Sequence, residues 1–204
     1  MKLYDTPRAP NPRRVRMFLA EKGLTIPREE INLIEGGAKT DAFRTINPMQ
    51  SVPVLVLDDG TALAETHAIC RYVEEAVAPE PNLMGRDARE RALIEMWNRR
   101  VEFGLFFHIA QVFRHLHPRL AALEQPQLAV WGEANRPKAV AQLAFWDGEL
   151  GRRRFMAGDR FTIADITGLV AVDMMPVARI ERPAGLNHLA RWHGEVASRP
   201  SAEA

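Results

Sequence analysis

The sequence predicts a small mixed α/β domain followed by an all-helical domain, and three observations support this fold class. Up to residue 78, short apolar stretches and turn residues alternate with short helical stretches. The segment Pro79-Glu80-Pro81-Asn82 is stiff and incompatible with a helix. Beyond this segment, apolar residues recur with helical spacing alone. We therefore expect an α/β domain over residues 1–78, a linker over 79–86 and a helical domain over 87–204.

A strand, a helix and a second strand are expected at the start of the chain. Residues 2–5 have the composition of a short strand. Asn11 can cap the next helix with Pro12 at its first position, where a missing N–H costs nothing, and Gly23 ends the helix. The second strand is expected over residues 30–33. A unit of this length joins parallel strands through a right-handed crossover.

A hairpin and the start of a helix are compressed into residues 51–66. An apolar run begins after Val52, and the tight turn at residues 58–60 reverses the chain. A second short strand then brings Glu65 and Thr66 to the start of a helix expected over residues 66–77. This arrangement places an exposed backbone edge beside polar groups that suit the charged end of a small peptide.

The second half of the chain is expected to be entirely helical. Apolar residues recur with helical spacing through residues 87–117, and residues 127–151 predict another helix. The segment Thr162-Ile163-Ala164-Asp165 predicts a capping box, with Asp in place of the usual Glu or Gln, before a strongly apolar helix. A last helix is expected over residues 186–198.

Composition and charge limit the classes of function. The chain has 204 residues, with 27 Lys and Arg against 26 Asp and Glu, which gives no electrostatic case for nucleic acid or a membrane as partner. A single cysteine, Cys70, excludes an intrachain disulfide framework and fits a reducing compartment. The N-terminus lacks the pattern of a signal peptide, and no apolar run is long enough to span a bilayer. We therefore expect a cytoplasmic protein.

Four groups of segments, in this order and spacing, resemble the glutathione S-transferase superfamily over nearly the whole chain. They are Pro10-Asn11-Pro12-Arg13-Arg14-Val15-Arg16 with Ala20-Glu21-Lys22-Gly23, Asn47-Pro48 with Ser51-Val52-Pro53-Val54-Leu55, Glu65-Thr66 with Ala68-Ile69, and Gly158-Asp159-Arg160-Phe161-Thr162-Ile163-Ala164-Asp165. The likeness is strongest to bacterial and fungal branches whose N-terminus reads Asp-Thr-Pro. The resemblance implies a thioredoxin-like N-terminal domain, a helical C-terminal domain, glutathione as co-substrate and, usually, a homodimer.

The same resemblance implies a glutathione site. In the family the Pro that matches Pro53 is cis, which turns the N–H and C=O of Val52 outward to pair with the extended tripeptide as an added strand. Glu65 and Thr66 match the pair that holds the γ-glutamyl end, and Thr66 can also be a helix cap. Lys39 matches a basic position that contacts the glycyl carboxylate, although an exposed, uninvolved Lys39 is nearly as good an interpretation. Ser51, next to Val52, can add a side-chain contact to the ligand.

The residue that activates the thiol does not match any of the usual branches. An unperturbed thiol has a pKa of about 8.5, so the protein must stabilise the thiolate. Ser-type branches have their Ser at the position of Ala9, and Cys-type branches have their Cys at the position of Pro10. Tyr4 lies one residue before the position used by Tyr-type branches and is expected on the opposite face of its strand.

Three candidates for thiol activation remain. Asn11 has an amide that can donate a hydrogen bond, and Thr6 has a hydroxyl in the same loop. The third is a water held by an imidazole of the helical domain, such as His115, which lies seven residues after His108 and so on nearly the same face. Each histidine can equally be a core-edge or surface residue. With His117 they lack a Cys or Glu in ligand register, so no metal site is expected.

The predicted reaction is transfer of glutathione to a hydrophobic electrophile. Phe106, Phe107 and Val112 are the expected lining of the hydrophobic co-substrate pocket, although an aromatic cluster at helical spacing is often plain core. Alternatives on the same fold are a glutathione-dependent peroxidase, a disulfide reductase and a dehalogenase. An isomerase is disfavoured because its Ser-Ser-Cys-type motif is absent from residues 6–12. A non-catalytic glutathione-binding protein is the alternative from another class, because Ala9 lacks a catalytic side chain.

Overall fold

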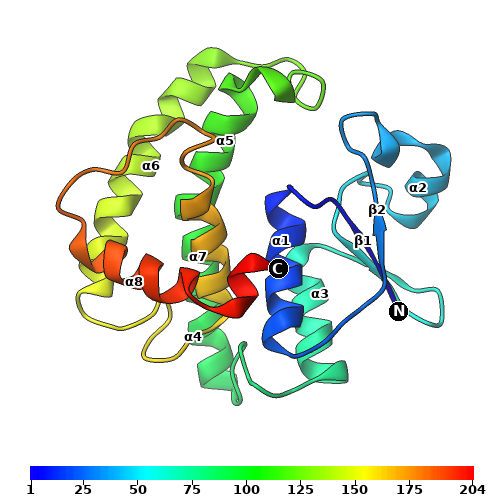
Figure 1. The fold of residues 1–204 in the computed structure, drawn as a ribbon, viewed down its shortest axis with the longest axis horizontal. Helices are drawn as coiled ribbons and strands as arrows, with labels where there is room; N and C mark the ends of the chain where they lie inside the picture. The colour runs from blue at the N-terminus through cyan, green and yellow to red at the C-terminus, as the bar shows by residue number, and fades with distance from the viewer. The chain divides into compact units, whose positions relative to one another are not determined.

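The computed structural model describes residues 1–204 and confirms the predicted fold class, a small mixed α/β part followed by a helical part (Figure 1). The chain divides into two compact units. Unit 1 contains Met1–Pro81 together with Glu203–Ala204, and unit 2 contains Asn82–Ala202. None of the helices combines the length and the apolar composition that a membrane crossing requires.

Unit 1 contains a four-stranded sheet in the order β2-β1-β3-β4. Strands β1 and β2 are parallel, whereas β1–β3 and β3–β4 are antiparallel. The elements of this unit are β1 (Lys2–Asp5), α1 (Pro10–Glu21), β2 (Arg28–Glu30), η1 (Gly37–Lys39), α2 (Asp41–Ile46), β3 (Val54–Val56), β4 (Ala62–Ala64), α3 (Thr66–Tyr72) and the π-helical η2 (Val73–Val77). The predicted crossover and the predicted hairpin are both confirmed.

Two boundaries differ from the predictions. Strand β2 covers Arg28–Glu30 rather than residues 30–33. The strand ends early because the Asn32 carboxamide oxygen accepts the backbone N–H groups of Ile34 and Glu35 at 3.1 and 3.2 Å, which turns the chain. Helix α1 begins at Pro10 with Ala9 as its N-cap, so Asn11 is not the cap. A Pro at the first helical position loses no hydrogen bond, which allows the earlier start.

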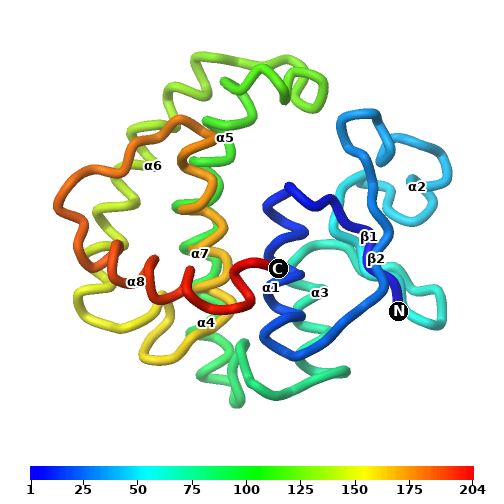
Figure 2. Tube along the Cα trace, viewed as in Figure 1, coloured from blue at the N-terminus to red at the C-terminus, as the bar shows by residue number.

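The two faces of the sheet are covered by different helices. Helices α1 and α3 lie side by side on one face, and α2 lies on the other (Figures 1 and 2). Leu3 points to the first face and is fully buried. Tyr4, the next residue, points to the second face, where its ring packs edge-on against Phe43 with centroids 5.8 Å apart. This alternation confirms that Tyr4 faces away from the side of the sheet that α1 covers.

Unit 2 is built from helices alone. Its elements are α4 (Ala88–Arg99), the π-helical η3 (Arg100–Phe106), α5 (Phe107–Leu116), η4 (Pro118–Leu120), α6 (Ala129–Leu150), α7 (Ile163–Asp173), α8 (Asn187–Ala197) and, running into the last residues, η5 (Pro200–Glu203). The predicted helix over residues 87–117 is therefore one helical run with a π-helical segment inside it. Helix α7 is buried along its whole length except at Asp173, which explains its strongly apolar sequence.

The predicted capping box at the start of α7 is confirmed. The Asp165 carboxylate accepts the backbone N–H of Thr162 at 2.9 Å and that of Met156 at 2.8 Å. It also accepts the indole N–H of Trp192 at 2.9 Å and the Thr162 hydroxyl at 3.2 Å. Burial raises the pKa of Asp165 to about 6, against the lowering effect of these donors. A single carboxylate thus joins the start of α7 to α8 and to the preceding loop.

Candidate active site

A buried asparagine shapes the turn that precedes the predicted tripeptide-binding edge. The Asn47 carboxamide donates to the backbone oxygen of Ser51 at 2.8 Å and to its hydroxyl oxygen at 3.2 Å. Its oxygen accepts the backbone N–H of Met49 at 3.1 Å. These three bonds fix residues 47–51, and the next peptide bond, Val52–Pro53, is cis. In the sequence, Asn47 is recognisable only as part of a motif, and the signal for its role is the turn-forming pair of Asn followed by Pro.

Val52 presents an open backbone edge. Its side chain is buried in the cluster around Phe43 and Val54, on the α2 face of the sheet. Strand β3 begins only at Val54, and no backbone hydrogen bond of the chain uses the N–H or C=O of Val52. These two groups are free to pair with an extended peptide, which is the mode of binding expected from the resemblance.

Glu65 and Thr66 follow directly on β4, and the last residue of β4, Ala64, pairs with Val54, two residues after Val52. Glu65 has φ 70° and ψ 120°, an unfavourable conformation for a residue with a side chain. Its exposed carboxylate has no partner within the chain. Glu65, and not Thr66, is the N-cap residue of α3.

The starts of α1 and α3 come together at Thr66. This residue is buried, and its hydroxyl donates a long hydrogen bond of 3.5 Å to the backbone oxygen of Asn11. Neither helix has a side-chain cap at its N-terminus. Two positive helix ends therefore meet in one place, where a carboxylate or a thiolate is stabilised.

Asn11 combines two unused N–H donors. Its side-chain oxygen accepts from the buried Arg14 guanidinium at 3.3 Å. A guanidinium can only donate, so the oxygen faces Arg14 and the NH₂ group points away, without a partner. In the first turn of α1, Pro10 and Pro12 have no N–H and the N–H of Arg13 bonds to Ala9, which leaves the N–H of Asn11 as the free backbone donor.

The loop before α1 is held by interactions between residues that are distant in the sequence. The Arg16 guanidinium forms a buried ion pair with Asp5 at 2.7 Å and donates to the backbone oxygen of Pro7 at 2.7 Å. Burial lowers the pKa of Arg16, and Asp5 opposes that effect. The Thr6 hydroxyl donates to the backbone oxygen of Ile31 at 2.6 Å, so its proton is already engaged. The only sequence signal for this ion pair is an Asp at the end of a strand, eleven residues before an Arg in the following helix.

The two remaining glutathione candidates are exposed. Lys39 lies in η1, after Gly36 and Gly37, and its ammonium group has no ion pair within the chain. Ser51 is exposed and accepts from Asn47 through both its oxygens. Both side chains are therefore accessible to a ligand.

In unit 2, His115 is a hydrogen-bond donor at its free nitrogen. Its Nδ1 accepts the backbone N–H of Leu128 at 3.0 Å, so the neutral ring carries its proton on Nε2. That nitrogen lies 3.8 Å from a carboxylate oxygen of Glu124. Within the same helical run, Val112 has no exposed surface and Phe106 is buried, whereas Phe107 is 39% exposed.

The chain supplies no reactive thiol of its own. Cys70 is buried in α3, and burial raises the pKa of its thiol to about 12. No three His, Cys, Asp or Glu side chains are grouped so that they could hold a metal ion. A reaction at sulfur therefore needs a thiol brought by a ligand.

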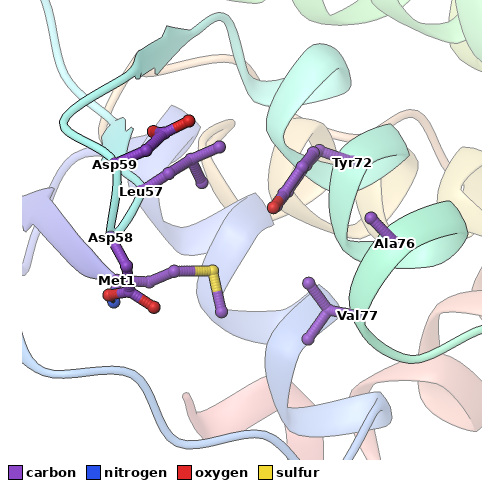
Figure 3. A pocket seen from close by; sticks show the side chains of 7 residues that line it. All are labelled: Met1, Leu57, Asp58, Asp59, Tyr72, Ala76 and Val77. Atoms are coloured by element: carbon purple, nitrogen blue, oxygen red, sulfur yellow. Dashed lines mark hydrogen bonds and ion pairs between the residues drawn. The ribbon is translucent and has the colours of Figure 1, made fainter.

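Unit 1 also has two surface depressions. One, of about 410 Å³, is lined by Met1, Leu57, Asp58, Asp59, Tyr72, Ala76 and Val77 (Figure 3). The other, of about 490 Å³, is lined by residues that include Pro7, Arg16, Arg28 and Ala204. Neither is lined by Val52 or Thr66.

Comparisons with known proteins agree over the whole chain. A family model of the glutathione S-transferase N-terminal domain matches residues 9–76, and one of the C-terminal domain matches residues 111–200. Glutathione S-transferase 2 of Saccharomyces cerevisiae is 36% identical over 204 residues, which cover 98% of this chain and 87% of the yeast protein.

Two solved structures are similar as well. A glutathione S-transferase domain-containing protein of Marinobacter aquaeolei VT8 is 41% identical with a TM-score of 0.95, covering 98% of this chain and 99% of that chain. Gtt2 from Saccharomyces cerevisiae is 36% identical with a TM-score of 0.94, covering 100% of this chain and 99% of that chain.

Proposed function

Since the chain belongs to the glutathione S-transferase family, we propose that it conjugates the thiolate of glutathione to a hydrophobic electrophile. The observation that carries this proposal is the open backbone edge of Val52, just before the strand that pairs with β4, together with the uncapped start of α3 that follows β4. The tripeptide would pair with Val52 as a short added strand. Its γ-glutamyl ammonium would bind the free Glu65 carboxylate, and its α-carboxylate would bind the Thr66 hydroxyl and the start of α3.

The roles of Lys39 and Ser51 rest on the resemblance to the family, and the role of Asn11 rests on its free donors. Lys39 would bind the glycyl carboxylate, and Ser51 would contribute beside Val52 and Pro53. Asn11 would donate to the thiolate, because its NH₂ group and its backbone N–H are both free. Lowering the pKa of the thiol by one unit requires about 1.4 kcal/mol, which one hydrogen bond to a charged group provides.

The reaction follows from these contacts. The thiol of glutathione loses its proton to solvent, and the thiolate sulfur attacks the electrophilic carbon. A carbon–sulfur bond forms, and the leaving group departs with its electron pair. The protein stabilises the thiolate and holds both reactants together, which removes the entropic cost of their encounter. Phe107, with Phe106 and Val112 behind it, would contact the electrophile, and His115 would hold a water through its Nε2–H.

We assign the protein to the cytoplasm and to detoxification, and we expect two copies to form a homodimer. Leu93, Met96 and Phe103 are exposed and recur with helical spacing along α4 and η3, and Met49 of unit 1 is 76% exposed. Exposed apolar side chains in such a row are typical of a protein interface. A Phe103→Glu variant that stays dimeric in light scattering would argue against this interface.

Two measurements test the proposed function. Retention on immobilised glutathione, and its loss in Glu65→Gln, tests the binding site. The pH dependence of thiolate absorbance in the bound complex tests activation, and we expect the pKa of the bound thiol to lie at least one unit below 8.5. If glutathione binds but its thiol titrates as in free solution, the non-catalytic binding protein is the better description, and Ala9 is the reason.

A further inference from the structure

One depression in the surface of unit 1 lies between the turn that joins β3 to β4 and the end of the helix that follows β4 (Figure 3). Residues 57–59 of the turn form one side, residues of the segment 72–77 form the other, and Met1 completes the lining. Leu57 and Tyr72 extend toward each other from the two sides. The lining contains no Lys, Arg or His and no residue of the candidate active site.

The π-helical end of the helix builds the apolar wall of this depression. Tyr72 is the last residue of α3, and Ala76 and Val77 follow it in η2. In a regular α-helix, residues five positions apart differ by about 140° around the axis and face different ways. The wider π-helical turn, marked by the bond from the N–H of Ala78 to the oxygen of Val73 at 2.8 Å, brings them closer in direction. Tyr72, Ala76 and Val77 can therefore line the same depression.

The turn on the opposite side holds a carboxylate that no cation of the chain neutralises. The turn is closed by the N–H of Leu57, which donates to the backbone oxygen of Thr61 at 2.9 Å. The Asp59 carboxylate accepts the backbone N–H of Thr61 at 2.8 Å and has no ion pair. Hydrogen bonds from Thr61 lower the pKa of Asp59, so this group is ionised at neutral pH. Asp58, in contrast, is paired with the Met1 ammonium.

These features together favour one chemical class of ligand. The ionised carboxylate of Asp59 attracts a positive charge. The Tyr72 hydroxyl has no partner within the chain, so its oxygen can accept an N–H from a ligand. The Tyr72 ring and the aliphatic side chains of Leu57 and Val77 suit an apolar body. An anion would meet two carboxylates here, and a neutral molecule would gain only the apolar contacts.

We propose that this depression is a binding site for small organic cations in which an ammonium group is attached to an apolar body. The ammonium donates to the Asp59 carboxylate and to the Tyr72 hydroxyl oxygen. The apolar body packs against Tyr72, Leu57 and Val77. The site is independent of the proposed function, because it needs neither glutathione nor the residues that would bind glutathione.

Titration of the full chain with three probes of similar shape tests the site without any variant and without glutathione. Phenethylammonium carries the required charge, 2-phenylethanol is neutral, and 3-phenylpropionate is negative. In nuclear magnetic resonance, phenethylammonium should move the backbone amide signals of residues 57–61 and 72–77. The alcohol should bind about threefold more weakly, and the anion should not bind. Equal binding of the three probes, shifts confined to other residues, or no shifts at about 20 mM phenethylammonium overturn the proposal.

Asp59→Asn separates the charge from the turn. The side-chain oxygen of Asn can still accept the N–H of Thr61, so the turn is kept while the negative charge is lost. The affinity for phenethylammonium should fall about threefold, and the affinity for the alcohol should not change. Glu35→Gln removes an exposed carboxylate elsewhere in unit 1 and should change neither affinity. Unchanged binding of phenethylammonium in Asp59→Asn overturns the proposal.

Discussion

The start of α7 and the start of α1 show two opposite ways to treat the end of a helix. At α7, the Thr162 and Asp165 side chains satisfy the backbone N–H groups from within the chain, and the whole turn is buried. At α1, Ala9 has no side-chain cap, and both N–H groups of Asn11 stay free. A closed helix start stabilises the fold, whereas an open one keeps its positive end for a ligand.

The start of α3, like that of α1, has no side-chain cap and is therefore open to a ligand. Glu65 precedes it with a positive φ and makes no cap bond, which costs stability. The two open starts meet in unit 1, and the closed one organises unit 2. We therefore expect substitutions at α7 to change stability, and substitutions at α1 and α3 to change binding and chemistry.

The largest effect should come from Asp165→Ala. The substitution leaves four donors without their acceptor, three of them backbone or indole N–H groups in the interior. We expect a loss of about 4 kcal/mol in the free energy of unfolding, measured with urea. Asp159→Ala, at an exposed position of the preceding loop, is the matched control. A loss below about 1 kcal/mol would show that the closed helix start is not what stabilises unit 2.

Asn11→Ala should leave stability nearly unchanged and weaken thiol activation. Removing one donor to the thiolate should raise the pKa of the bound thiol by about one to two units and lower turnover about 10- to 100-fold. Thiolate absorbance against pH measures the first effect. Asn187→Ala, at the first position of α8, is the control for losing an Asn at a helix start. Normal activity in Asn11→Ala with a loss in Thr6→Val would transfer the role to Thr6, and losses in neither would favour a water held by His115.

Glu65→Gly should separate stability from binding. Glycine adopts a positive φ without steric cost, so we expect the free energy of unfolding to rise by about 1 kcal/mol. Glutathione affinity, measured by calorimetry, should fall at least tenfold because the carboxylate is lost. Glu35→Gly in an exposed turn, where φ is not positive, should show no such gain. A destabilised Glu65→Gly protein would mean that Glu65 is not strained in solution.

The smallest effect is expected at Cys70. Because burial raises the pKa of its thiol to about 12, the thiol stays protonated at pH 8 and cannot act as a nucleophile. The folded protein should release no colour with a disulfide reagent such as Ellman's, and the same protein in urea should react with one equivalent. Rapid reaction in the folded state would contradict this prediction and would show that the Cys70 thiol itself is reactive in unit 1.

Local signals made most of the fold predictable. The capping box at Thr162–Asp165 and the hairpin before Thr66 are complete within a few residues of sequence. The start of α1 was misplaced because Pro10 and Pro12 are equally suitable first residues, and nothing nearby distinguishes them. The end of β2 depended on an Asx turn at Asn32.

The site was only partly predictable for a different reason. Glu65, Thr66 and Val52 were identified by the resemblance, and they flank the paired strands β3 and β4. The hydrogen-bond partners of His108 and His115 are Asn135 and the backbone N–H of Leu128, which are distant in sequence and contact them only after α5 and α6 pack. No pattern within a single helix could identify these partners.

The π-helical segment Arg100–Phe106 has a genetic consequence. It holds one residue more than a regular helix would need, as the bond from the N–H of Phe107 to the oxygen of Glu102 shows. Loss of a single codon within this segment would regularise the helix, and the reading frame would survive. Every side chain after it would keep its direction around the axis, because the residue lost is the one that the wide turn accommodates. His108 and His115 would still face Asn135 and Leu128, so this segment is where the helical run can lose a residue without disturbing the packing of α5 on α6.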